Sequence, residues 1–133
     1  MYADVGQLGL KDRVLFTGFR RDIPQILAAL DIYVHTSLEK DSSPLALVSA
    51  MAAGRPIVCS RVDGAAELIE EDVEGLLTRP GDSAGLAEAL KRLVRDLDLR
   101  KRLGQAARAK AERDLSVERF TRRCEAVFER ALG

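Results

Sequence analysis

The sequence predicts an α/β fold, with a parallel sheet of about four strands flanked by helices and followed by an all-helical C-terminal region. Four apolar runs, too short for helices, are typical of strands, at residues 14–17, 32–36, 57–60 and 75–78. Helical patterns separate them, and this alternation indicates parallel strands joined by crossover helices. The 133 residues therefore predict one domain, with a sheet region at 1–80 and a helical region at 81–133.

Three helices are predicted between the strands, over residues 23–30, 45–53 and 65–69. Asp22 is placed to cap the first, whose second residue, Pro24, is tolerated in a first turn. The second helix ends at Gly54, and Pro56 then begins the next strand. Each helix is short, as expected for a connection that crosses one face of a sheet.

The helical region follows a Pro-Gly-Asp turn and shows apolar residues at helical spacing. Asp82 or Ser83 is expected to cap its first helix, and Ser116 its last. The last helix has a continuous apolar face, formed by Val117, Phe120, Cys124, Val127, Phe128 and Leu132.

The overall composition is that of an ordinary folded domain. A net charge of zero argues against a generic nucleic-acid binder, which would carry a basic excess. No segment approaches the roughly 18 apolar residues of a membrane span. Cys59 and Cys124 have neither metal-binding nor redox spacing, so a reduced, cytoplasmic protein is expected. Neither a metal nor an organic cofactor is predicted.

The segment that turns from the second strand into its helix is the best candidate for a binding site. A loop that leads into a helix presents unpaired backbone N–H groups, which suit a phosphate. Asp41 at the start of this loop either accepts hydrogen bonds from ligand hydroxyls or is a solvated or capping acid. Gly64 and Glu67 form a second such turn, although Glu67 could simply stabilise its helix dipole. No catalytic residue can be assigned.

Four stretches of the chain, in order, resemble motifs of one protein family. They are DRVLFTGF at 12–19, LAALDIYVHTS at 27–37, AMAAGRPIV at 50–58 and GLLTRPGD at 75–82. Together with the helical tail, they resemble the C-terminal, donor-nucleotide-binding domain of a GT-B fold, retaining glycosyltransferase of the group 1 type. The resemblance implies a nucleotide-sugar donor as substrate and hexosyl transfer by the intact enzyme.

The resemblance also implies a role for individual residues. The expected contacts are the donor sugar for Asp41, the phosphates for Ser42, Ser43, Pro44 and Leu45, the ribose for Ser49, and the base for Gly18, Phe19 and Arg20. Gly64 and Glu67 are secondary candidates. The family has an acid where this chain has Ser49, and serine offers one neutral hydrogen bond in place of two charge-assisted ones. We therefore expect weakened donor affinity.

Two strands that the family places between residues 14–17 and 32–36, and the acceptor-binding domain, have no counterpart in this sequence. The chain is therefore expected to be the donor-binding half of such an enzyme, inactive alone, or alternatively a non-catalytic binding or dimerisation module. Either the two strands pair directly, or a missing N-terminal segment or a second copy fills the gap, because an open sheet edge promotes association.

Overall fold

The computed structural model describes residues 2–39 and 44–133 and has an α/β architecture. Its sheet has three parallel strands in the order β1-β2-β3, formed by Tyr33–His35, Ile57–Ser60 and Gly75–Thr78. The predicted class is confirmed. The consecutive order means that each crossover helix connects neighbouring strands. Because all three strands are parallel, their carboxyl ends lie at one edge of the sheet.

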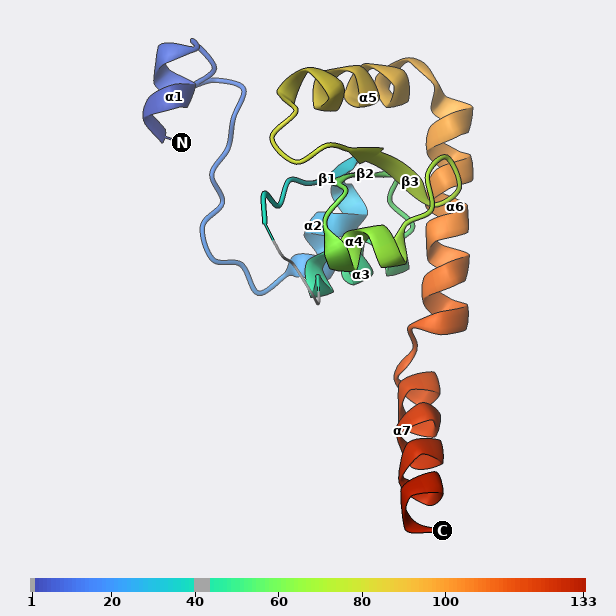
Figure 1. Cartoon of the computed structure of the whole chain (residues 1–133). Helices are drawn as coiled ribbons and strands as arrows, with labels where there is room; N and C mark the ends of the chain where they lie inside the picture. Colours follow the sequence, from blue (N-terminus) through green and yellow to red (C-terminus); the bar gives the residue numbers. More distant parts are fainter. Residues whose placement is uncertain (1, 40–43) are drawn as a thin grey trace.

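The helices form two layers around the sheet (Figure 1). One layer contains α2, α3 and α4, formed by Ile23–Ala29, Leu45–Ala52 and Asp63–Leu68. The other layer contains α5, Ser83–Arg95, which packs on β2 and β3. The long helix α6, Leu97–Asp114, runs past the β3 side of the sheet and packs against both α5 and α3.

Two hydrophobic clusters fill the space between these layers. Ile57 and Cys59 point from β2 toward α3 and α4, where Met51 is fully buried. Val58, between them, points toward α5 and packs with Leu93. This alternation follows from the two-residue period of a strand. Residues of α6 contribute to both clusters, so α6 joins the two layers.

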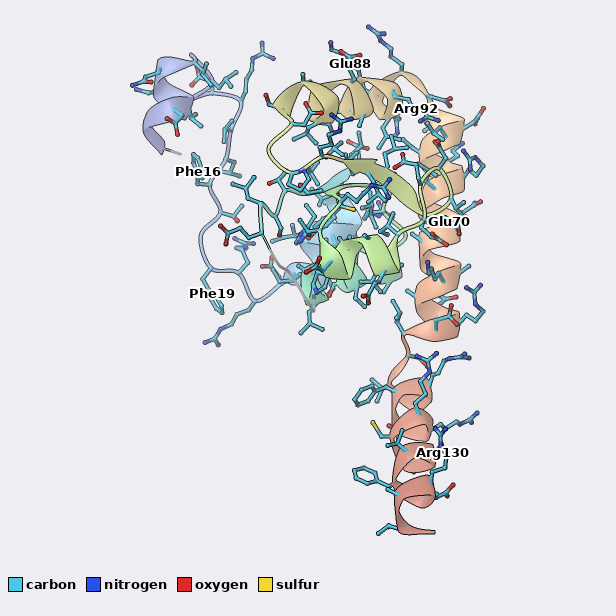
Figure 2. The ribbon with its side chains drawn as sticks, viewed as in Figure 1. Phe16, Phe19, Glu70, Glu88, Arg92 and Arg130 are labelled. Carbon is cyan, nitrogen blue, oxygen red and sulfur yellow. The ribbon has the colours of Figure 1, made fainter. Side chains whose placement is uncertain are left out.

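The expected strand at residues 14–17 is wrong, and so is its direct pairing with the second predicted strand. This stretch has no strand geometry, and Leu15 is 85% exposed. With helix α1, Tyr2–Gln7, it lies apart from the sheet, and Figure 2 shows Phe16 and Phe19 on it. A strand forms only with a neighbour that accepts its backbone hydrogen bonds, and none of the three described strands pairs with this stretch.

The predicted helix ends are mostly confirmed. Asp82 accepts a hydrogen bond from the Gly85 backbone N–H at 2.8 Å, and Ser116 accepts one from Arg119 at 3.3 Å. Asp22 holds the cap position of α2 but makes no capping hydrogen bond through its side chain. Its carboxylate instead pairs with Arg20, at 2.6 and 2.8 Å.

Arg55 fixes the C-terminal ends of α2 and α3 relative to each other. Its guanidinium donates to the Ala53 carbonyl at 3.0 Å and to the Leu30 carbonyl at 2.9 Å. These carbonyls are among the groups that a helix leaves without an intrahelical partner. One side chain thereby caps two helices that flank the candidate site.

Helix α7, Val117–Leu132, extends away from the sheet after α6 (Figure 1). Its predicted amphipathic face exists, but the apolar side chains are exposed, including Phe120 at 69% and Phe128 at 66%. In the described part of the chain, no helix is both long and apolar enough to cross a bilayer.

Candidate functional site

The carboxyl edge of the sheet brings the two predicted turn-helix segments together. Helix α3 follows β1, and α4 follows β2, so both begin at this edge and on the same side of the sheet. In open parallel sheets ligands bind at this edge, outside the strand ends. Pro44, the residue before α3, has no side-chain group that could cap the helix. The Leu47 N–H donates to the Pro44 carbonyl at 2.9 Å, so the first-turn N–H groups that suit a ligand are those of Leu45 and Ala46.

Four of the predicted site residues line one cavity of about 370 Å³: Pro44, Leu45, Gly64 and Glu67. Pro44 and Gly64 are buried, whereas Leu45 and Glu67 are exposed. The cavity is completed by residues from the junction of α6 and α7, including Leu115, Phe120 and Arg123. It combines a carboxylate, a guanidinium and an aromatic ring, groups that can contact different parts of a polar ligand.

Arg123 is the residue that sequence reasoning did not connect with the site. It lies in the second turn of α7, among several other arginines of the helical region. No motif distinguishes it from these neighbours, because its position beside α3 and α4 depends on the length and direction of α6. It supplies a positive charge to a cavity whose other titratable groups, Glu67 and Asp114, are acids.

Ser49 lies away from this cavity. It lines a second cavity of about 530 Å³, in the groove between α2 and α3, together with Ile23, Pro24, Leu27, Ala28, Ala52 and Ala53. The Ser49 hydroxyl donates a hydrogen bond to the Leu45 carbonyl at 2.8 Å, one helical turn earlier. Because the only proton of the Ser49 hydroxyl is donated in this hydrogen bond, the hydroxyl can act toward a ligand only as an acceptor.

The residues expected near the base lie on the extended segment before α2. Gly18 adopts a positive φ of 62°, and Phe19 is 88% exposed. The Arg20 guanidinium donates to Asp22 and holds the pKa of that carboxyl below its usual range. None of these residues lines either of the two cavities. The predicted residues Asp41, Ser42 and Ser43 lie outside the described residues.

The chemistry of the described residues does not include an activated thiol or a metal centre. Both cysteines are free, and burial, followed by the charge of Glu71, raises the pKa of the Cys59 thiol to about 12. That thiol stays protonated at neutral pH and is a poor nucleophile. Within residues 2–39 and 44–133, no group of three His, Cys, Asp or Glu side chains could hold a metal ion.

Comparison with known proteins gives a consistent family match. The sequence model described as "Glycosyl transferases group 1" matches residues 2–96. The N-acetyl-alpha-D-glucosaminyl L-malate synthase of Bacillus anthracis is 33% identical over 124 residues, which are 93% of this chain and 32% of that enzyme. The 2-deoxystreptamine glucosyltransferase of Streptomyces kanamyceticus is 37% identical over 98 residues, which cover 72% of this chain and 25% of that enzyme.

The fold also matches solved structures. The structure of Anabaena HepE in complex with UDP superposes with a TM-score of 0.94 at 34% identity, over 96% of this chain and 35% of that one. Its complex with UDP-glucose gives a TM-score of 0.92. The C-terminal domain of a group 1 glycosyl transferase from Francisella tularensis superposes with a TM-score of 0.76 at 27% identity, over 87% of this chain and 60% of that one. The chain spans about one third of the length of the first relatives that it matches.

Proposed function

Because this chain belongs to the group 1 glycosyl transferases, we propose that it is the part of a retaining transferase that binds the nucleotide-sugar donor. The observation that carries the proposal is the start of α3 at the carboxyl edge of β1, where no side chain of the cap residue bonds the helix, beside a cavity that Pro44, Leu45, Gly64 and Glu67 line. Helix N-termini at this edge suit the diphosphate of a donor.

The similarity to HepE supports the ligand class. HepE has been solved with UDP and with UDP-glucose, and this chain superposes on it over 96% of its length. In the proposed arrangement Asp41 contacts the donor sugar, the backbone of residues 42–45 the phosphates, and Ser49 the ribose. Because the chain spans about one third of the length of the relatives that it matches, we propose that the chain alone binds the donor without turnover.

A titration with UDP-, GDP- and ADP-glucose tests this proposal. We expect saturable binding of one of them by isothermal calorimetry, weakened at least tenfold in Asp41→Ala, because a carboxylate that accepts ligand hydroxyls contributes a charge-assisted hydrogen bond. Asp98→Ala, on α6, is the control and is expected to bind as the parent does. Binding that Asp41→Ala leaves unchanged would contradict the assignment of the sugar contact.

The second candidate is a non-catalytic module that retains the fold and has lost donor binding. The observation that favours it is the Ser49 hydroxyl, whose proton is already donated to the Leu45 carbonyl. The same titration separates the two functions, since a non-catalytic module is expected to give no heat of binding with any of the three nucleotide sugars.

We place both functions in the cytoplasm, where two unpaired cysteines are ordinary.

We further propose that the isolated chain forms a homodimer. Its support is the position of β1 at the sheet edge and the exposed apolar face of α7, where Leu132 is 89% exposed. Exposed apolar faces and open strand edges both favour association. Light scattering is expected to give twice the 14.6 kDa mass of one chain, and Phe128→Glu is expected to lower it. A concentration-independent monomer would refute the dimer.

A further inference from the structure

Three hydroxyl side chains lie in one row at the carboxyl edge of the sheet. Ser60 pairs with Thr78, and continuing the register of β1 and β2 by one residue places Thr36 beside Ser60. Val58 and Leu76, each two residues earlier on its strand, pack in the cluster on the α5 side of the sheet. Since side chains two residues apart share a face, this hydroxyl row also faces α5, at intervals of about 4.8 Å.

The hydroxyl row lines a cavity of about 240 Å³ on the opposite side of the sheet from α3 and α4. Arg79 and Asp82 lie at the same cavity, with the apolar side chains of Leu38 and Leu86 beside them. Pockets that enclose drug-sized ligands measure about 300 to 1,000 Å³, so this one has room for a single small ring.

Ser60 is the residue that indicates a ligand. The residue as a whole is only 4% exposed, but its oxygen is not among the fully buried polar atoms that lack a partner, because it lines the cavity. A hydroxyl placed in this way takes its hydrogen-bond partner from water or from a ligand inside the cavity. The Ser60 hydroxyl opens into the cavity, where a ligand hydroxyl could donate to it and accept from it.

The surrounding groups favour a neutral polyol over an anion. The N-terminal turn of α5 would attract an anion, but Asp82 already caps it through the Gly85 N–H and places a negative charge at the cavity. Hydroxyls, one carboxylate and one guanidinium together offer both acceptors and donors, which a sugar ring needs. The two leucines provide apolar surface for its C–H faces.

We propose that the cavity above the hydroxyl row binds a single sugar ring. This site is separate from the donor site and does not depend on it, because the two lie on opposite faces of the sheet. In a sugar-transferring enzyme, a second saccharide site on the donor-binding part would hold a sugar unit of the acceptor or of the product.

The test is a titration of the ¹⁵N-labelled chain with glucose, galactose and N-acetylglucosamine, followed by amide chemical shifts, with inorganic phosphate in parallel. We expect one sugar to shift the amides around Thr36, Ser60 and Thr78. Ser60→Ala and Thr36→Val are each expected to weaken that sugar about tenfold, because each removes one hydrogen-bonding hydroxyl. The control Thr121→Val removes a hydroxyl on α7, which donates to the Val117 carbonyl, and is expected to bind sugar normally.

Three results would overturn the proposal: no shift with any sugar, shifts that both hydroxyl deletions leave unchanged, or shifts with phosphate alone. Ser60→Ala should fold, since it removes a buried hydroxyl without a protein partner, and Thr36→Val changes an exposed residue. UDP-glucose added to the same sample reports on residues 44–49 of α3 instead. The two proposals can therefore fail independently of each other.

Discussion

Replacing Gly104 with alanine is expected to destabilise the fold by about 3 kcal/mol, near the upper end of the range for overpacking a core. Gly104 is buried on α6 where this helix crosses the end of α3. A Cβ atom at this position would overlap the Gly54 carbonyl oxygen and approach its carbonyl carbon to 3.2 Å. These are backbone atoms, so no rotamer change can relieve the overlap, and α6 must move away from α3.

Urea unfolding followed by circular dichroism measures this effect. A loss of about 3 kcal/mol is a large part of the roughly 5 to 15 kcal/mol that stabilises a small domain. The matched control is Gln105→Ala, at the next position of α6, where the side chain is exposed and the change should be within about 0.5 kcal/mol. An alanine at residue 104 that raises the urea midpoint, as it would in an open helix, would show that the close approach is absent.

The sequence predicted elements whose stability is local or whose neighbours are adjacent in the chain. The strands Ile57–Ser60 and Gly75–Thr78 have the predicted bounds, because apolar β-branched runs between turn residues need only their sequential neighbours to pair. Residues 14–17 have a similar pattern, but β1, the next strand along the chain, does not pair with them, and they are largely exposed. Apolar composition indicates a capacity to pair, whereas pairing requires a partner that composition does not reveal.

The candidate site was predictable to a similar degree. Pro44, Leu45, Gly64 and Glu67 meet because parallel strands bring successive turn-helix segments to one edge, and strand order alone predicts this. Arg123 and Phe120 join them only through the path of α6, which no local pattern encodes. Gly104 likewise has no sequence signature, since a helical glycine indicates a close contact but not its partner. The hydrogen bond from the Ser49 hydroxyl to the Leu45 carbonyl could not be predicted either, because it depends on which side-chain rotamer Ser49 adopts.

Replacing Ser49 with glutamate is expected to raise the affinity for a nucleotide sugar by about tenfold to a hundredfold. A carboxylate can accept two charge-assisted hydrogen bonds from a ribose diol. A hydrogen bond to a charged group contributes about 1.5 to 3 kcal/mol, compared with about 0.5 to 1.5 kcal/mol for a neutral one. The exposed position of Ser49 beside a cavity of about 530 Å³ gives the longer side chain room. Glutamate also favours a helix at least as well as serine, so α3 should remain intact.

Calorimetric titration with UDP-glucose compares three forms: the parent chain, Ser49→Glu and the neutral isostere Ser49→Gln. If charge is what the site lacks, only glutamate should gain affinity, and the gain should shrink as salt screens an exposed interaction. An equal gain with glutamine would assign the effect to reach or packing instead of charge. No gain with either residue would mean that the groove between α2 and α3 does not receive the ribose, and the proposed donor orientation would have to be rejected.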